Sequence, residues 1–79
     1  MNNTEIESYV IETISQYSWE ITKKVELSDD LSWLLDLVDV ENVVIDLEDN
    51  FNIYISDNDR DNFKTVGDMV KYVMEKVGK

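Results

Sequence analysis

The sequence predicts an all-α fold: a small four-helix bundle with three main helices, one short helix and a long first loop. Apolar residues recur at spacings of three and four in three separate stretches, which is the period of an amphipathic helix. Only one short segment alternates apolar and polar residues as a strand would, and it has no second strand to pair with. No proline interrupts the 79 residues. A chain of this length is expected to form a single domain, residues 1–79.

The first helix is expected from about Thr4 to Tyr17. Thr4 and Glu7 have the spacing of a capping box, in which two side chains satisfy the free amides at the start of a helix. The face expected to be buried carries Ile6, Val10, Ile14 and Tyr17.

Residues 18–35 form a long connection that is too apolar for a disordered linker. A short helical turn is expected from Asp29 or Asp30 through Leu35, because the preceding residues supply capping oxygens. Four apolar side chains should close the top of the bundle: Ile21, Val25, Leu27 and Leu31.

The second main helix is expected from about Asp36 to Phe51, and Asn52 can close it in the left-handed conformation. Ile53 and Ile55 then lie in an extended connector that buries both side chains. The apolar stripe predicted for this helix contains Leu37, Val40, Val44, Leu47 and Phe51.

Two further helix starts follow. Ser56 with Asp59 signals a short helix of one or two turns, and Thr65 with Asp68 is a capping box that opens the last helix. The last helix has the buried stripe Val66, Met69, Val70, Val73 and Val77.

Composition removes several classes of function. The chain has no cysteine and no histidine, which excludes disulfides, thiol nucleophiles and the usual zinc ligands. No membrane-spanning stretch and no secretory signal are visible, so a cytoplasmic protein is expected. The net charge is −11, and residues 26–61 hold twelve acids against one base, Arg60. Such a surface repels nucleic acids and anionic membranes and attracts a basic patch on a protein partner.

The residues from Asp36 onward carry a resemblance to a known family. Asp36-Leu37-Val38 is followed by Leu47-Glu48-Asp49-Asn50-Phe51, then by Ile53-Tyr54-Ile55 and Thr65-Val66. This order and spacing resemble the acyl carrier proteins and related peptidyl carrier domains, whose pattern begins Asp-Ser-Leu. The resemblance needs no gap from about residue 36 to residue 70.

One position departs from the family pattern. Carrier proteins attach a 4′-phosphopantetheine arm to the serine of that motif, and the matching residue here is Leu37, which has no hydroxyl. We therefore expect no cofactor. The alternative is a functional acyl or peptidyl carrier that is modified with 4′-phosphopantetheine on another serine, such as Ser32.

The resemblance implies that the chain is not an enzyme and acts by binding proteins as an adaptor, regulator or decoy of carrier-binding enzymes. The partner would be an enzyme of fatty-acid, polyketide or nonribosomal peptide synthesis that docks with a basic patch. The acidic face of the second main helix would supply the contacts, with Trp33 as an exposed aromatic anchor. The expected partner-binding residues are Asp36, Leu37, Val40, Glu41, Asp46, Glu48 and Trp33.

Two weaker alternatives remain. The acidic charge is compatible with mimicry of nucleic acid, although this leaves the carrier-like spacing unexplained. The spacing Asp57-x-Asp59-x-Asp61 with Asp68 echoes a calcium loop, but the sixth position is Asn62 instead of glycine. We therefore expect no dedicated metal site.

Overall fold

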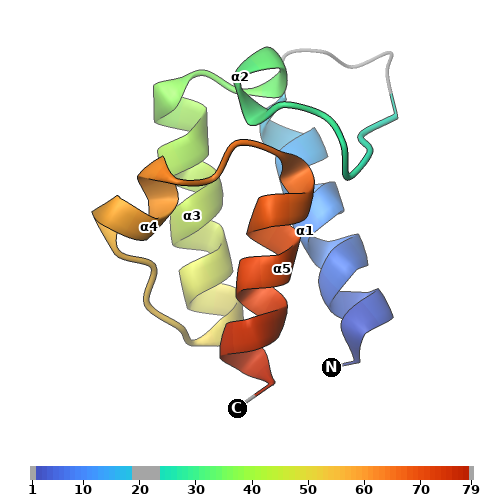
Figure 1. Cartoon of the computed structure of the whole chain (residues 1–79), viewed down its shortest axis with the longest axis vertical. Coiled ribbons are helices and arrows are strands. Elements are labelled where there is room, and N and C mark those ends of the chain that lie inside the picture. Colours follow the sequence, from blue (N-terminus) through green and yellow to red (C-terminus); the bar gives the residue numbers. More distant parts are fainter. Residues whose placement is uncertain (1, 19–23, 79) are drawn as a thin grey trace.

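The computed structural model describes residues 2–18 and 24–78, and this part of the chain contains five helices. The three long helices are α1 (Asn3–Tyr17), α3 (Leu37–Phe51) and α5 (Val66–Val77), and the two short ones are α2 (Leu31–Leu34) and α4 (Asp57–Asp61). Figure 1 shows that α1 runs antiparallel to α3 and α5, that α2 lies across one end, and that α4 lies beside α3. The predicted all-α bundle is confirmed.

The core lies between the three long helices. The buried residue types are almost all aliphatic, and each fully buried Leu, Ile or Val contributes about 1.5–3 kcal/mol relative to an exposed one. The buried hydrophobic residues of the long helices are Ile6, Val10, Ile14, Val43, Val44, Leu47, Val66, Met69, Val70 and Val73.

The start of α1 differs from the prediction. The Asn2 side chain accepts a hydrogen bond from the Glu5 amide at 2.9 Å, and the Glu5 carboxylate accepts one from the Asn2 amide at 3.0 Å. Asparagine is at least as good an N-cap as threonine, so the capping box forms two residues before the expected Thr4. The capping box of Thr65 and Asp68 is present as predicted. Amides of Lys64 and Thr65 donate to the Asp68 carboxylate and lower its pKa.

The later part of the long connection is tied to the start of α5 by main-chain hydrogen bonds. Leu31 N donates to Lys64 O at 2.9 Å, Val66 N to Asp29 O at 3.0 Å, and Gly67 N to Leu27 O at 2.8 Å. A Cβ at Gly67 would lie 3.1 Å from the Leu27 carbonyl, so glycine permits this close approach. These hydrogen bonds, which we call the brace, therefore join residues 27–31 before and at the start of α2 to residues 64–67 at the start of α5.

The prediction that four apolar side chains of the long connection close the top of the bundle is only partly correct. Val25 and Leu31 are buried, whereas Leu27 is 42% exposed. The Leu27 carbonyl accepts the hydrogen bond from the Gly67 amide, while its side chain stays at the surface. Ile21 lies outside the described residues.

The predicted stripe of α3 is wrong at its first position. Val44 and Leu47 are buried, but Leu37 is 88% exposed. Leu37 is the first residue of the helix, two turns before the buried Val44, so its side chain projects beyond the core centred on Val43 and Leu47. The other end is as predicted: Asn52 has φ 54° and ψ 49° and closes the helix in the left-handed region.

Candidate functional site

A cavity of about 710 Å³ lies where α2, α3 and α4 meet. Leucine, valine and phenylalanine side chains form much of its wall, and a few polar residues stand among them. We call it the α2–α4 cavity, and it is lined by Leu31, Ser32, Leu35, Asp36, Leu37, Val40, Glu41, Arg60, Asp61 and Phe63.

The junction of α2 and α3, which we call the α2–α3 corner, places both Leu37, at the family attachment position, and the alternative residue Ser32 at this cavity. Asp36 is the N-cap of α3, and its Oδ1 accepts a hydrogen bond from the Asp39 amide at 2.8 Å. Leu37 is therefore the first residue of the helix, and its side chain projects into solvent. Ser32 is exposed on α2 and lines the same cavity.

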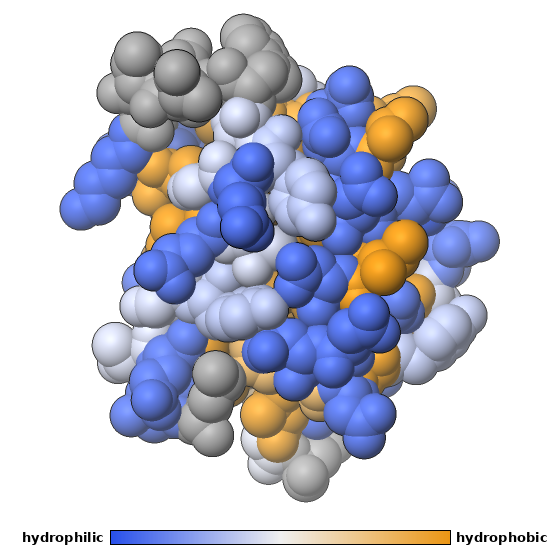
Figure 2. Space-filling view, turned by 180° about the vertical axis from the view of Figure 1, so that it is seen from behind, coloured by the Kyte–Doolittle hydropathy of each residue, from blue (hydrophilic) through white to orange (hydrophobic). Residues whose placement is uncertain are grey.

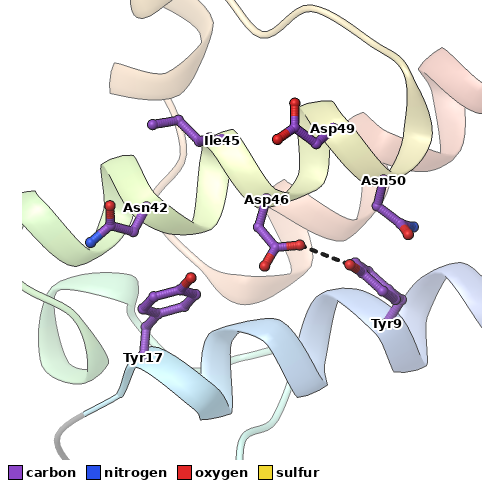
Figure 3. Close-up of a pocket in the computed structure, with 7 residues that line it drawn as sticks. All are labelled: Tyr9, Tyr17, Asn42, Ile45, Asp46, Asp49 and Asn50. Carbon is purple, nitrogen blue, oxygen red and sulfur yellow. Dashed lines mark hydrogen bonds between the residues drawn. The ribbon is translucent and has the colours of Figure 1, made fainter.

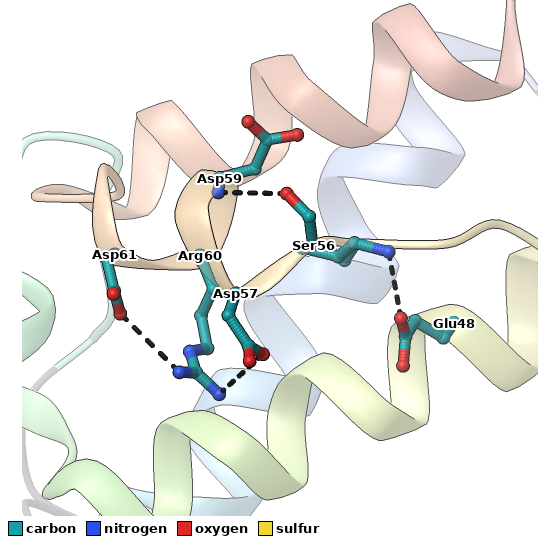
Figure 4. A network of polar contacts seen from close by, with 7 residues as sticks. Glu48, Ser56, Asp57, Asp59, Arg60 and Asp61 are labelled. Atoms are coloured by element: carbon teal, nitrogen blue, oxygen red, sulfur yellow. Dashed lines mark hydrogen bonds and ion pairs between the residues drawn. The ribbon is translucent and has the colours of Figure 1, made fainter.

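Helix α4 forms the opposite wall. Arg60 contacts Asp57 and Asp61, with nitrogen–oxygen distances of 3.5 Å to each carboxylate (Figure 4). The Tyr72 hydroxyl of α5 donates to Asp59 Oδ2 at 2.9 Å and so holds α4 against the bundle. Burial and the Asp59 carboxylate raise the pKa of Tyr72 to about 12. The Arg60 guanidinium is thus the basic group of a wall whose other ionised groups are acids.

The predicted partner-binding residues do not form one continuous face. Asp36, Leu37, Val40 and Glu41 line the α2–α4 cavity, and Trp33 is 64% exposed on α2 near it. Glu48 is half-buried, and its Oε2 accepts a hydrogen bond from the Ile55 amide at 2.8 Å. This bond gives Glu48 an internal role in holding the connector.

The remaining predicted residue, Asp46, faces α1 instead. Its Oδ1 accepts a hydrogen bond of 2.7 Å from the Tyr9 hydroxyl, as Figure 3 shows. The hydrogen bond to that carboxylate raises the pKa of Tyr9 above its ordinary value. Asp46 therefore belongs to a different surface from Asp36 and Glu41.

Sequence reasoning missed Arg60 and Phe63 in the cavity wall and Tyr9 beside Asp46. One signal for Arg60 was available, since it is the single base among the acids of residues 26–61. No comparable signal marks Phe63 or Tyr9, because the pairing of α1 with α3 and of α4 with α2 is a long-range property.

The residues of the calcium-like spacing are used in other ways. Asp57 and Asp61 contact Arg60, Asp59 accepts from Tyr72, and Asp68 caps α5. Within residues 2–18 and 24–78, no three His, Cys, Asp or Glu side chains are grouped so that they could hold a metal ion. The same part of the chain contains no helix long and apolar enough to cross a membrane.

Comparison with known proteins gives close relatives across most of the chain. The acyl carrier protein of Exiguobacterium sibiricum is 37% identical over 73 residues, which cover 92% of this chain and 90% of that protein. The acyl carrier protein of Thermotoga maritima is 31% identical over 75 residues, or 95% of this chain and 90% of that protein. No protein-family model matches the chain.

A solved structure shares the fold. The crystal structure of a Toxoplasma-specific mitochondrial acyl carrier protein superposes with a TM-score of 0.84, covering 99% of this chain and 93% of that one, at 24% identity.

These relatives overturn the expectation of no cofactor. Acyl carrier proteins carry a 4′-phosphopantetheine group, so the alternative with that group is the better supported one. Of the two positions considered at the α2–α3 corner, one can hold the 4′-phosphopantetheine group and the other cannot. Leu37 offers no hydroxyl for the phosphoester bond, whereas the exposed Ser32 does.

The relatives also agree with the expectation that the chain is not an enzyme, because acyl carrier proteins present substrates to other enzymes. Sequence identity above 30% over nine-tenths of the chain, together with the matching fold, shows the family. This chain belongs to the acyl carrier protein family.

Proposed function

We propose that the chain is an acyl carrier protein whose 4′-phosphopantetheine arm is attached to Ser32, and whose α2–α3 corner docks on basic surfaces of partner enzymes. The arm supplies a thiol that holds an acyl group as a thioester. The partners are enzymes of fatty-acid, polyketide or nonribosomal peptide synthesis. The proposal rests on one observation: the exposed Ser32 lines the same cavity as Leu37. Leu37 stands at the attachment position of the family and has no hydroxyl.

The register supports Leu37 as the replaced position. Asp36 matches the aspartate of the family motif and caps α3, so the next residue stands at the first helical position. The distance in sequence from Asp36 to Phe51 also matches the family pattern without a gap. Ser32 lies five residues before Leu37, on α2, and is an exposed residue that lines the same cavity.

The other described serines are less suitable. Ser18 is buried, Ser15 Oγ donates to Ile11 O at 2.9 Å, and Ser56 Oγ accepts from the Asp59 amide at 3.1 Å. Ser8 and Ser28 are exposed but line none of the cavity. Ser32 therefore combines exposure with a place next to the expected attachment position.

Docking through this corner follows from its charge and its exposed apolar groups. Asp36 and Glu41 are exposed carboxylates on the cavity rim, and Trp33 and Leu37 are exposed apolar side chains beside them. A partner with an apolar pocket and a rim of Lys or Arg complements both features. The net charge of −11 also steers such a partner at low salt.

The attachment is tested by incubating the purified chain with coenzyme A and a phosphopantetheinyl transferase. The Ser32 oxygen forms a phosphoester, the pyrophosphate of coenzyme A breaks, and adenosine 3′,5′-bisphosphate leaves. Intact-mass spectrometry should show one phosphopantetheine adduct, and peptide mapping should place it on Ser32. The adduct should be absent from Ser32→Ala and present in the control Ser28→Ala. No adduct, or an adduct mapped elsewhere, contradicts the assignment to Ser32.

The docking half is tested separately by capture of partners from the native cell on immobilised protein. The charge-reversed variant Asp36→Lys/Glu41→Lys should lose the basic enzymes that the natural chain retains, and high salt should release them. Retention of the same enzymes by the charge-reversed variant contradicts docking through this corner, whether or not the arm is attached.

A further inference from the structure

The wall of the α2–α4 cavity is unfavourable to an anion except at one residue. Three of its lining residues are exposed acids, Asp36, Glu41 and Asp61. Among the described residues, Arg60 is the only Lys or Arg that lines it. A 4′-phosphopantetheine arm joins its protein through a negatively charged phosphodiester. An arm on Ser32 therefore brings a further negative charge to a cavity that has three acids and one base.

A hollow with a base in its wall is not general in this protein. A second hollow, between α1 and α3, is shown in Figure 3 and contains no Lys or Arg among its described residues. It is lined by Tyr9, Tyr17, Asn42, Ile45, Asp46, Asp49 and Asn50. An adjoining hollow on α1 has no described base either. Of these three hollows, the one that Ser32 lines is the one that contains an arginine.

The α2–α4 cavity also differs from the outer surface of the bundle. Figure 2 shows one such face, which is mostly hydrophilic and has hydrophobic residues only in small separate patches. The cavity instead gathers five apolar side chains: Leu31, Leu35, Leu37, Val40 and Phe63. Charges beside an apolar wall are less screened than charges surrounded by water. The sign and position of each charged group in this cavity therefore matter for a phosphate held there.

Arg60 is only loosely paired with its neighbours on α4. Its guanidinium nitrogens lie 3.5 Å from a carboxylate oxygen of Asp57 and of Asp61 (Figure 4). A strong charge-assisted hydrogen bond is shorter, at about 2.7–2.9 Å. The two aspartate side chains are 89% and 72% exposed, and exposed ion pairs contribute little stability. The guanidinium can therefore exchange one of these partners for another anion at small cost.

The backbone that carries Arg60 is held against the bundle. Ser56 caps α4 by accepting the Asp59 amide at 3.1 Å, and the Tyr72 hydroxyl donates to the Asp59 side chain at 2.9 Å. The Tyr72 ring also packs edge-on against Phe63, with 5.2 Å between the ring centroids. These contacts keep the α4 backbone beside the cavity.

We propose that Arg60 is a positioning residue that binds the phosphodiester of the arm on Ser32. This inference rests on the proposed attachment at Ser32 and extends it by assigning a role to α4. A guanidinium is always protonated, and its paired N–H donors match two oxygens of a phosphate. The other ionised groups described in the cavity wall are carboxylates, which repel the phosphate.

The first test is phosphorus NMR of the full chain, loaded with the arm by a phosphopantetheinyl transferase and coenzyme A. The phosphorus resonance of Arg60→Gln should be displaced from that of the natural chain, because the phosphate loses its hydrogen-bond donor. Attachment of the arm to the natural chain should also shift the Arg60 Nε–Hε resonance. An unchanged phosphorus resonance in Arg60→Gln would overturn the proposal.

Lys64→Gln is the matched control for the loss of one positive charge. Lys64 is exposed and lines none of the three hollows. The phosphorus resonance of loaded Lys64→Gln should coincide with that of the natural chain. A displacement equal to that of Arg60→Gln would assign the effect to net charge and contradict the role of Arg60.

A thermodynamic cycle separates this role from the ion pairs of Arg60 with Asp57 and Asp61. Urea unfolding is measured for the natural chain and for Arg60→Gln, each with and without the arm. The arm should lower the folding equilibrium constant about two- to fivefold more in Arg60→Gln than in the natural chain. Arg60→Lys, which keeps the charge but not the paired donors, should recover part of this difference. If Arg60 serves only its neighbours on α4, the arm will have the same effect in all three proteins, and the proposal is wrong.

Peptide mapping of the same samples tells the two proposals apart. An arm on Ser32 that shows no dependence on Arg60 contradicts the role of Arg60 and leaves the attachment intact. Absence of an arm from Ser32 contradicts the attachment, and the role of Arg60 with it. If Arg60→Gln accepts no arm, the comparison is made with Arg60→Lys, in which the phosphorus resonance should still be displaced.

Discussion

The two flanks of α3 differ in the way they use carboxylates. On the flank toward α2 and α4, Asp36 and Glu41 stand exposed at the rim of a largely apolar cavity. On the flank toward α1, Asp46 is hydrogen-bonded to Tyr9 and the wall is aromatic and polar. One helix that the sequence describes as a single acidic face therefore serves two surfaces of different chemistry.

Composition alone therefore cannot assign the acidic residues of one helix to a single partner. Asp46 and Glu48 are two residues apart, and both bond within the protein, but to different elements: Asp46 to α1 and Glu48 to the connector after α3. Asp49 is their neighbour and is exposed. Because successive residues rotate by about 100° around a helix, neighbours in sequence reach different environments.

The largest expected effect comes from the core that both flanks share. Leu47 is fully buried at the centre of α3, so Leu47→Ala should leave a cavity that costs about 2–5 kcal/mol of unfolding free energy. The unfolding free energy measured with urea should fall by this amount. A loss below about 1 kcal/mol would contradict the placement of Leu47 in the packed core.

Glu48 and Asp49 give the next contrast. Glu48→Ala removes the acceptor of the Ile55 amide and should destabilise the protein by about 1–3 kcal/mol, because that amide loses its hydrogen-bond partner. Asp49→Ala should stay within about 0.5 kcal/mol, because the side chain is exposed. Similar unfolding free energies for the two variants would contradict the internal role of Glu48.

Each flank also has one tyrosine–aspartate hydrogen bond, Tyr9 to Asp46 and Tyr72 to Asp59. Replacing either tyrosine by phenylalanine should cost about 1 kcal/mol at pH 7. The pKa of Tyr72 is about 12 in the folded protein and about 10 in the unfolded chain. The folded state thus favours the neutral phenol, and its contribution is complete below pH 10 and is lost as the pH rises toward 12.

Chemical denaturation at several alkaline pH values measures this effect. The natural chain should lose stability between about pH 10 and pH 12, and Tyr72→Phe should show a shallower loss over the same range. Parallel curves for the two proteins would show that Tyr72 is not held as a neutral donor to Asp59.

The smallest effect on stability is expected at the cavity rim. Leu37→Ser places a hydroxyl at the family attachment position, and because Leu37 is exposed the unfolding free energy should change by less than about 0.5 kcal/mol. A phosphopantetheinyl transferase should then add a second adduct at residue 37, which intact mass and peptide mapping will detect. A Leu37→Ser protein with no adduct at residue 37 contradicts the register that aligns Leu37 with the family serine.

Most of the fold was predictable because its signals are local. The left-handed Asn52, the capping box of Thr65 and Asp68, and the short helix after Ser56 all depend on side chains within four residues of each other. The errors at Leu27 and Leu37 are long-range in origin. Their exposure depends on which elements cover them, and a hydrophobic pattern records only that a residue is apolar.

The candidate site was predictable in part. The order of motifs around Asp36 and Phe51 located the α2–α3 corner, and Ser32 was identified as the alternative attachment residue. The split of the acidic face was not predictable, because the partners of Asp46 and Glu48 lie on α1 and in the later connector. The expectation of no cofactor was wrong because it generalised from one absent hydroxyl to the whole chain.

The brace between the long connection and α5 has a consequence for divergence among relatives. Its three hydrogen bonds join main-chain atoms of residues 27–31 to those of residues 64–67, so they are indifferent to most side chains at these positions. Substitutions in residues 27–31 and 64–67 can therefore leave the backbone path unchanged. Gly67 is the exception, because a Cβ there would approach the Leu27 carbonyl too closely. A chain only 24% identical to a solved relative can thus retain the same fold. Part of that fold is held by hydrogen bonds between main-chain groups, which nearly every residue type supplies.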